Sequence, residues 1–403
     1  MSVRASLSAT VLALACASVL PAGDDWPQYR GPNIDGISPA KGLFANLKDG
    51  PAQVWKAQVG IGCSTVVVAD GLAYTSGNTK DVDTLFAFDA ATGKPAAGWT
   101  NYAFPEKLDP NFYDGGPSAS PTVTGGVVYG LSRSGRAYAV DAKTGKEKWA
   151  VDLATQTGAK PPTWGFTSSP RLIDGKLFLS VGRTGTALDP ATGAVLWKSG
   201  TEPAGYASVV PAQVGGAPHL LIFASKSLSL VAPADGKVAW EIPWTSQYDT
   251  NAADPIVVGT QAFFSSLGDK GNAGSGVYEL SATGAKPVWS SKILKTKLSP
   301  AVKVGDHLYG IDAGKLACVA WKTGEKSWDK TGFGEGGLVA AEGKLVALTE
   351  NGELVIIEAN PAAYTEVTRG GVISKRTWTP PTIANGLVYV RNIKGAVAAV
   401  ALR

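Results

Sequence analysis

A turn followed by a tryptophan recurs along this chain, and this repeat constrains the fold more than any other feature. It reads DAKTGKEKW at positions 141–149 and DPATGAVLW at positions 189–197, and related phrases end at four other tryptophans. Successive tryptophans lie roughly 40 to 50 residues apart, a period typical of propellers and solenoids. We predict that all six pack between neighbouring repeats as structural side chains: Trp99, Trp149, Trp197, Trp240, Trp289 and Trp328.

Each period contains four short stretches with the composition of strands. Positions 120–153 read SPTVTGG, VVYGLSRSG, RAYAVDAKTG and KEKWAVDL, each rich in Val, Tyr, Ala or Leu and bounded by turn residues. In the Asp-x-x-Thr-Gly turn, glycine tolerates the positive φ of a tight hairpin, and aspartate can bond its own backbone two residues on. Four antiparallel strands in each period make one blade of a β-propeller.

Counting the first strands predicts eight blades. They begin near Ser64, Ser120, Ser169, Val210, Asp254, Ser299, Gly337 and Pro380. The eighth blade ends at Arg403 after three strands, and DGPAQVWKAQVG at positions 49–60 carries a spare strand of matching pattern, with Trp55 as its docking residue. We therefore predict an all-β, eight-bladed propeller spanning residues 24–403 as one domain, closed by the N-terminal strand so that no sheet edge stays exposed.

The first 23 residues have the pattern of a secretory signal peptide, with a basic start and an apolar core too short for a membrane span. We expect a periplasmic or secreted protein; lipidation of Cys16 is an alternative, although Ala13 stands where a lipobox usually has leucine. Cys63 and Cys318 fall in distant blades, so we expect no disulfide. The net charge of +4 and the absence of any Lys/Arg run longer than two residues argue against nucleic acid, and we expect a monomer.

Common catalytic signatures are missing from the sequence. It has no Walker A loop, GxSxG elbow, HExxH or CxxC motif, and only two histidines, His219 and His307. Two longer connections between second and third strands carry oxygen ligands, Asp81 with Asp83 and Asp269 with Asn272, but neither has the ligand count of a calcium loop. We therefore assign no catalytic residue and no metal site.

The segments that precede the first strands offer a candidate binding site. In a four-stranded antiparallel blade, these segments emerge on the same face as the loops between second and third strands, and they surround the mouth of the central channel. The candidate rim residues are Trp164, Tyr206, Asn251, Asp254, Lys297, Arg376 and Trp378, with Tyr113, Asp114 and Phe166 beside them. Aromatic groups beside charged ones suit a binding rim. The alternative is that each aromatic residue only caps the core.

The DxxTGxxxW repeat, together with the opening DWPQYRGPNIDGIS at positions 25–38, resembles the bacterial PQQ-like β-propeller repeat proteins. That family includes outer-membrane-protein assembly factors of the BamB type and the quinoprotein alcohol dehydrogenases. The opening is also similar to secreted propellers of planctomycete-type genomes. This resemblance covers nearly the whole mature chain and implies the fold, whereas function depends on sites that differ between proteins of one fold.

Two hypotheses follow from the resemblance. The first is a non-catalytic propeller that binds or scaffolds a protein partner in the cell envelope, with glycan binding on the aromatic rim as a variant. The second is a quinoprotein dehydrogenase, in which PQQ lies in the channel mouth on Ca²⁺, with a carboxylate as base, a tryptophan beneath the quinone and a Cys-Cys disulfide above it. The sequence has no Cys-Cys pair and no CxxCH motif, and no flanking motif carries these roles to Trp164 or Asp254. We favour the first hypothesis and expect no cofactor.

Overall fold

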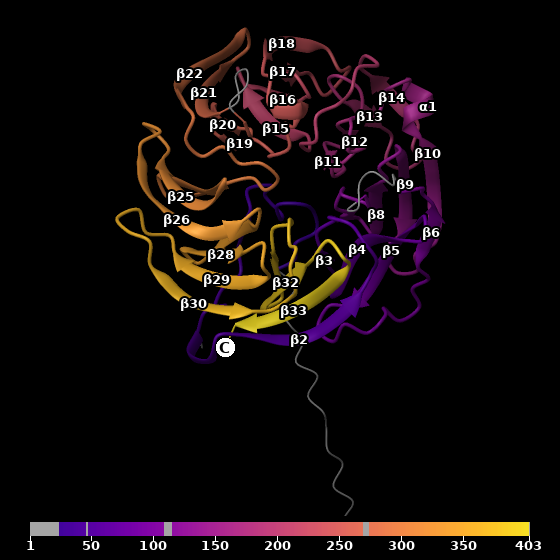
Figure 1. Cartoon of the computed structure of the whole chain (residues 1–403). Helices are drawn as coiled ribbons and strands as arrows, with labels where there is room; N and C mark the ends of the chain where they lie inside the picture. The colour runs from indigo at the N-terminus through magenta and orange to yellow at the C-terminus, as the bar shows by residue number, and fades with distance from the viewer. Residues whose placement is uncertain (1–23, 46, 109–114, 269–273, 403) are drawn as a thin grey trace, which may run out of the picture.

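The computed structural model describes residues 24–45, 47–108, 115–268 and 274–402. Within them, eight four-stranded antiparallel blades form a closed ring around a central channel (Figure 1). The eight innermost strands begin within three residues of the predicted positions, which confirms the predicted eight-bladed propeller. The predicted signal peptide, Cys16, Tyr113, Asp114, Asp269 and Asn272 lie outside the described residues.

The two inner strands of each blade line the channel and the region next to it. In blade order, the first strands are β3 (Val67–Ala69), β7 (Thr122–Thr124), β11 (Arg171–Ile173), β15 (Val210–Val214), β19 (Ile256–Val258), β23 (Val302–Val304), β27 (Gly337–Ala341) and β31 (Thr382–Ala384). The second strands are β4 (Leu72–Thr79), β8 (Val127–Leu131), β12 (Lys176–Leu179), β16 (Ala217–Phe223), β20 (Gln261–Ser265), β24 (His307–Asp312), β28 (Lys344–Leu348) and β32 (Leu387–Arg391).

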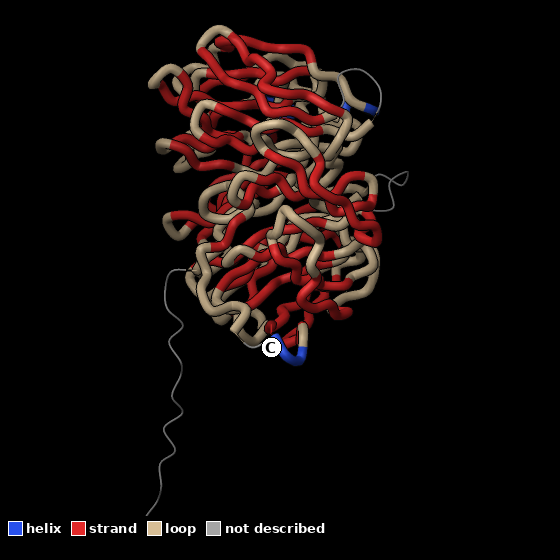
Figure 2. Tube along the Cα trace, turned by 90° about the vertical axis from the view of Figure 1, so that its left-hand side faces the viewer, coloured by secondary structure: helices blue, strands red, loops and turns tan. Residues whose placement is uncertain are grey.

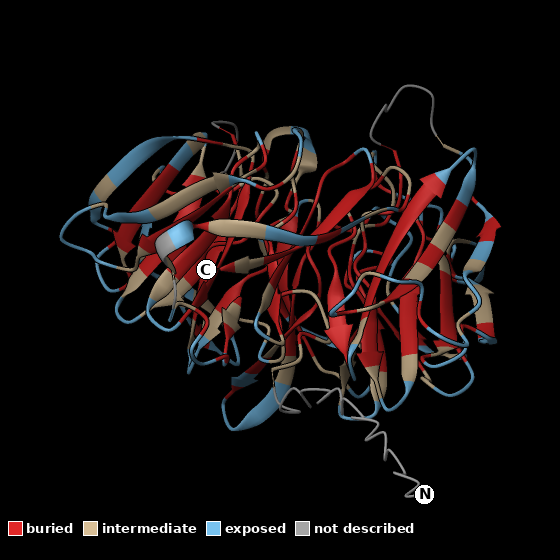
Figure 3. Ribbon diagram, turned by 90° about the horizontal axis from the view of Figure 1, so that it is seen from below, coloured by how far each residue is buried: buried red, intermediate tan, exposed pale blue. Residues whose placement is uncertain are grey.

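The two outer strands complete each blade. The third strand is mostly buried, and the fourth strand at the outer edge is the more exposed of the two (Figure 3). The third strands are β5 (Val82–Asp89), β9 (Arg136–Asp141), β13 (Thr186–Leu188), β17 (Ser227–Val231), β21 (Ser275–Ser281), β25 (Gly314–Ala320), β29 (Glu353–Glu358) and β33 (Ala396–Leu402). The fourth strands are β6 (Tyr102–Pro105), β10 (Glu147–Asp152), β14 (Val195–Lys198), β18 (Val238–Pro243), β22 (Gly284–Ser291), β26 (Lys326–Gly334), β30 (Glu366–Gly371) and, in the eighth blade, β2 (Pro51–Gln58). Described helix is confined to short turns, namely α1 (Leu153–Thr157), η1 (Leu47–Asp49) and η2 (Gln247–Asp249) (Figure 2).

The two ends of the chain close the ring, as the sequence predicts. Strand β2 pairs antiparallel with β33, from Pro51 opposite Leu402 to Gln58 opposite Ala396, with a bulge beside Trp55. This pairing makes β2 the outer strand of the blade formed by β31, β32 and β33. The third strand of every blade is therefore paired on both sides.

The repeated tryptophan docks each blade on the next through its indole nitrogen. Nε1 donates to a backbone carbonyl in or beside the turn that joins the third and fourth strands of the following blade, over 2.7 to 3.1 Å. The six tryptophans that make this bond are Trp55, Trp149, Trp197, Trp240, Trp289 and Trp328. A hydrogen-bonded aromatic at each blade interface accounts for the period of the sequence.

The tryptophan ring packs directly over the glycine of the turn that joins the third and fourth strands of the next blade. A Cβ added at Gly93, Gly193, Gly236 or Gly324 would lie 2.5 or 2.6 Å from an indole carbon of the preceding blade. These glycines also have φ between +69° and +77°. The turn therefore requires glycine for two reasons, its backbone conformation and the ring packed over it.

Trp99 departs from the pattern. Five residues separate Gly93 from Trp99, where the other turns have three or, before Trp289, four, so Trp99 precedes β6 instead of lying in the fourth strand as expected. Its Nε1 has no acceptor among the described residues. The carbonyl of Ala142, at the matching position of the next blade, accepts from the Tyr74 hydroxyl over 2.8 Å instead. Trp99 packs edge-on against Tyr74, with ring centroids 5.6 Å apart.

One of the two predicted long connections is a hairpin. Strands β4 and β5 each have eight residues and are joined by Lys80 and Asp81, both at positive φ, so the loop expected around Asp81 and Asp83 is wrong. Asp83 lies in β5, is 3% exposed and accepts from Asn78 Nδ2 over 2.7 Å. It belongs to the blade and not to a ligand-binding loop.

The N-terminal segment crosses the channel before it reaches β2. Trp26 forms a β-bridge with Val68 in the first blade, and the carbonyl of Pro27 accepts from Val123 in the second. Further along the segment, β1 (Ile37–Ser38) pairs parallel with β27 in the seventh blade. The WPQYRGP opening thus forms a plug, which we define as residues 26–38.

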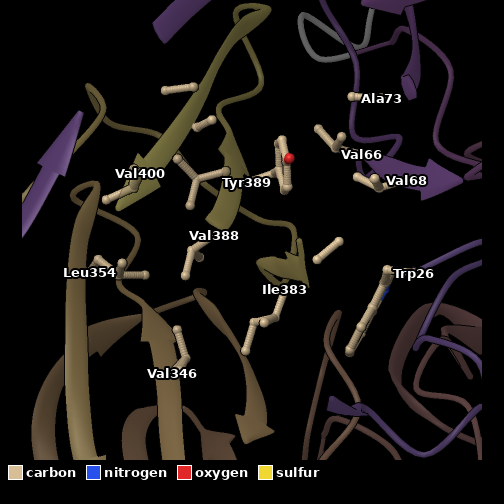
Figure 4. Close-up of a cluster of buried hydrophobic side chains, with 14 of the residues drawn as sticks. Trp26, Val66, Val68, Ala73, Val346, Leu354, Ile383, Val388, Tyr389 and Val400 are labelled. Atoms are coloured by element: carbon tan, nitrogen blue, oxygen red, sulfur yellow. The ribbon is translucent and has the colours of Figure 1, made fainter. Parts of the chain in front are cut away.

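Buried apolar side chains anchor the plug to the ring. Figure 4 shows Trp26 beside Val68 and Ile383 in a cluster that joins the seventh, eighth and first blades. Trp26 is 1% exposed, and Tyr389 and Val400 of the eighth blade are equally buried in the same cluster. The blades that hold the two chain ends therefore share one core with the plug.

Candidate functional site

A cavity of about 490 Å³ opens at the mouth of the channel. Its aromatic lining residues come from the plug and from the segments before four first strands: Tyr29, Trp164, Tyr206, Tyr248 and Trp378. Its charged lining residues are Arg133, Asp254 and Lys297. Serine and threonine hydroxyls make up much of the remaining wall. This size and mixture suit a small-molecule or side-chain binding site.

Five of the seven rim residues predicted from the sequence line this cavity: Trp164, Tyr206, Asp254, Lys297 and Trp378. Asn251 does not, because it is fully buried and its Nδ2 donates to the carbonyls of Ala224 and Ser225. Arg376 does not either. Its guanidinium lies 5.1 Å from the ring centroid of Trp378 and 3.5 Å from a Glu350 oxygen, so it covers the far side of Trp378.

A chain of hydrogen bonds links the first four blades to the fifth around the wall of the cavity. Thr65 N donates to Ser120 Oγ over 3.0 Å, and Ser120 N donates to Ser169 Oγ over 3.0 Å. Ser169 N then donates to Ser208 Oγ over 3.1 Å, and Ser208 N to Asp254 Oδ1 over 2.7 Å. We call this the hydroxyl ring. Asp254 thus occupies the position that serine holds in other blades.

The second oxygen of Asp254 pairs with a guanidinium across the channel. Arg171 Nη2 lies 3.1 Å from Asp254 Oδ2, and both side chains are at most 1% exposed. Arg171 Nη1 also donates to the carbonyl of Tyr29 over 2.8 Å, so the pair holds the plug in place. Burial raises the pKa of Asp254 and lowers the pKa of Arg171, while the charge of each partner opposes the shift of the other.

The plug supplies the floor of the cavity. Tyr29 is a lining residue, and the Arg171 guanidinium lies 6.0 Å from its ring centroid. Burial and the charge of Asp254 raise the pKa of the Tyr29 hydroxyl, which therefore stays protonated at neutral pH. Arg30 is also buried, and its Nη2 donates to the carbonyl of Ala301 on the far side of the ring.

Sequence reasoning missed four aromatic or cationic residues of this site, Tyr29, Arg133, Arg171 and Tyr248, and the serine and threonine hydroxyls of its wall. Arg171 had a signal, because the residue after Ser-Pro or Pro-Pro at the start of a blade is Thr122, Ala301 or Thr382 elsewhere. A guanidinium at a buried repeat position implies a buried partner. Tyr29 lies outside the repeat, so no comparison between blades could place it.

Comparison with known proteins agrees with this architecture. The family model described as "Outer membrane protein assembly factor BamB" matches residues 96–330, which is more than half of the chain. The chain belongs to this family of PQQ-like β-propellers.

Two curated relatives are quinoprotein dehydrogenases. "Quinohemoprotein alcohol dehydrogenase ADH-IIG" of Pseudomonas putida is 31% identical over 155 residues, which cover 35% of this chain and 20% of the relative. The dehydrogenase subunit of the quinone alcohol dehydrogenase of Komagataeibacter europaeus is 29% identical over 154 residues, 34% of this chain and 20% of the relative. The match thus spans a fifth of the length of each relative.

Solved structures show the shared fold. BamB from Moraxella catarrhalis has a TM-score of 0.64 at 16% identity and covers 87% of this chain and 99% of its own. The quinohemoprotein alcohol dehydrogenase from Comamonas testosteroni has a TM-score of 0.63 at 14% identity and covers 96% of this chain and 81% of its own. This chain is therefore similar to a BamB-like and to a quinoprotein-like propeller alike.

Proposed function

We propose that this propeller is a binding protein of the cell envelope that holds a partner or ligand at the channel mouth without converting it. The state of Asp254 carries the proposal. It is the single carboxylate among the described lining residues, and its two oxygens are taken by Ser208 N and Arg171. A general base must reach the proton that it removes. Both oxygens of this carboxylate are already bonded within the protein, one to the hydroxyl ring and one to the arginine that holds the plug.

The alternative is a quinoprotein dehydrogenase, which the two curated relatives favour. A quinone bound on Ca²⁺ needs several oxygen ligands and, in the enzymes this family includes, a Cys-Cys cover. The described ranges contain no group of three His, Cys, Asp or Glu side chains that could hold a metal ion, and the described cavity lining has one cysteine, Cys63, and no adjacent Cys-Cys pair. The described residues do not fit that cofactor, so we derive no redox step.

The likeness to BamB supports a protein partner and a place outside the cytoplasm, in agreement with the predicted signal peptide. None of the helices in the described ranges is long and apolar enough to cross a membrane. We propose a protein that acts in the periplasm or as a secreted component, and that contacts its partner through the aromatic and cationic groups of the mouth.

Site-specific photo-crosslinking in the native cell tests the contact face. A photoreactive phenylalanine at Tyr248, which is 72% exposed on the rim, should crosslink to a partner. The same group at Lys322, in the exposed turn between β25 and β26 on the opposite face, should not. Crosslinks from Lys322 alone would contradict the proposed face.

A dye-reduction assay tests the absence of turnover. The purified mature chain is incubated with PQQ and Ca²⁺ and then given a primary alcohol and an electron-accepting dye. We expect no reduction above the protein-free control. Reduction that disappears in Asp254→Asn would establish the dehydrogenase alternative.

A further inference from the structure

The wall of the mouth cavity is made of hydrogen-bond donors. In the hydroxyl ring, Ser120, Ser169 and Ser208 each accept a backbone N–H through Oγ, and no acceptor for their own protons appears among the described residues. All three line the cavity and are at most 3% exposed. A hydroxyl whose oxygen is already an acceptor has a proton left to donate.

Thr379 adds a hydroxyl that has no partner at all in the described structure. It lines the same cavity from the eighth blade, is 4% exposed, and its Oγ1 forms no hydrogen bond. A buried hydroxyl without a partner costs free energy, and a bound acceptor would remove that cost. Four buried hydroxyls from four blades therefore line one cavity, and each could donate to an oxygen atom of a bound ligand.

The charges around this space favour an anion. Arg133 and Lys297 are the two cations of the lining, and the salt bridge of Lys297 to Glu335 joins two partly exposed groups, which makes it weak. Beneath the cavity, the buried guanidiniums of Arg30 and Arg171 face one buried carboxylate, Asp254. Four cationic side chains thus lie in or beneath the cavity, and they outnumber the two carboxylates of their described salt bridges, Asp254 and Glu335.

The arrangement of the aromatic side chains in the cavity suits a ligand whose ring is not planar. The Trp164 ring lies 5.7 Å from Tyr206 at 55° and 6.4 Å from Tyr248 at 85°, so these rings form a corner and not two parallel walls. Trp378 keeps one face under Arg376. The C–H bonds of a sugar ring can pack on the negative face of an aromatic ring, and two rings at an angle contact a puckered ligand on two sides, whereas a planar polycycle could stack on one of them only.

We propose that the channel mouth binds an acidic sugar, a pyranose ring that carries a carboxylate or a sulfate group. The anionic oxygens accept from the hydroxyls of Ser169, Ser208 and Thr379, and the ring packs in the corner formed by Trp164 and Tyr248. Lys297 supplies the nearby positive charge. This inference rests on the proposed function, which places binding at the channel mouth. It adds the chemical class of the ligand.

Calorimetric titration of the mature protein tests the proposal, with D-glucuronic acid and D-galactose 6-sulfate as the two acidic probes. D-glucose is the neutral control, and PQQ is the planar aromatic control. We expect saturable binding of at least one acidic sugar and binding of glucose weaker by about tenfold or more, since a hydrogen bond to a charged group is worth about 1.5 to 3 kcal/mol. Which acidic sugar binds tells carboxylate from sulfate.

Two buried hydroxyl variants locate the site. Thr379→Val keeps the side-chain shape and removes a hydroxyl that has no partner, so it should leave the melting temperature unchanged and weaken acidic-sugar binding about tenfold. Ser299→Ala is the matched control, because Ser299 is equally buried and its Oγ is also unpartnered, but it does not line the cavity. This variant should bind as the wild type does.

Three results would overturn the inference. Equal affinities for glucose and glucuronic acid would contradict the role of the charge. Equal losses of affinity in Thr379→Val and Ser299→Ala would contradict the proposed location of the site. Binding of PQQ without any sugar would replace the ligand class. If no sugar binds while Tyr248 still crosslinks to a partner, this inference fails and the proposed function stands.

Discussion

At the scale of single residues, the Thr-Gly turn illustrates what a sequence reveals and what it conceals. The positive φ of its glycine follows from the turn itself and was predicted. The indole packed over the same glycine comes from the preceding blade, roughly 40 residues away, and no local pattern indicates it. The turn glycine thus meets two requirements, a positive φ and room for the indole. Comparing it with a glycine that has the same φ but no indole contact separates them.

Gly193→Ala should destabilise the protein more than Gly175→Ala. Both glycines lie in the third blade at φ +75°, but an added Cβ meets the Trp149 ring at 2.6 Å at Gly193 and nothing within 4 Å at Gly175. We expect a loss of about 1 to 2 kcal/mol for Gly175→Ala from backbone strain and about 2 to 5 kcal/mol for Gly193→Ala from strain and overpacking. Denaturant unfolding measures both. Equal losses would show that the indole yields without cost.

Asp83 should make stability depend on pH. Burial raises its pKa to about 7, with the charge of Glu106 acting in the same direction, while the hydrogen bond from Asn78 opposes the shift. The folded state thus holds a proton that the unfolded state has lost above about pH 4, so this group's contribution favours folding at low pH and is lost as the pH rises to 7. Asp83→Asn has no group that ionises at this position, so it does not lose this stability as the pH rises. Its melting temperature relative to wild type should rise between pH 5 and pH 8, and a constant difference would contradict the assignment.

At the scale of elements, the sequence predicted the strands and the closure of the ring, but not the plug. Strand β2 repeats the pattern of a fourth strand and includes Trp55, so the spare segment at one end could be matched with the missing strand at the other. Residues 26–38 repeat nothing. Their place depends on the buried contacts of Trp26 and Arg171, which arise only when the ring has formed.

Two truncated chains isolate the contribution of β2. A chain that begins at Pro51 and one that begins at Ile61 both lack the plug, and they differ in β2 and the two residues after it. The shorter chain exposes the edge of β33 and loses Trp55, which is 7% exposed in the full protein. Its free energy of unfolding should be lower by about 3 to 5 kcal/mol, and it should aggregate more readily. Equal melting temperatures of the two chains would contradict the closure.

At the scale of the whole molecule, the candidate site could be predicted in part because the repeat places it. Residues that precede the first strands must meet around one axis, and this brought Trp164, Lys297 and Trp378 together although more than 200 residues separate the first from the last. The same reasoning failed for Asn251 and Arg376. One turns inward to bond backbone carbonyls and the other packs behind a neighbour, and side-chain direction is not encoded in repeat position.

The closed ring should unfold as one unit, because it has no terminal blade from which melting can begin. Trp55 bonds the eighth blade to the first, and Trp240 bonds the fourth to the fifth on the opposite side. Replacing either with alanine should lower a single transition by about 3 to 5 kcal/mol, and the two losses should add because the sites share no partner. An open array would instead respond blade by blade, since each repeat there depends on its nearest neighbours. Circular dichroism and tryptophan fluorescence should therefore report coincident transitions in both variants, and transitions that separate in either one would show that the ring does not act as a single cooperative body.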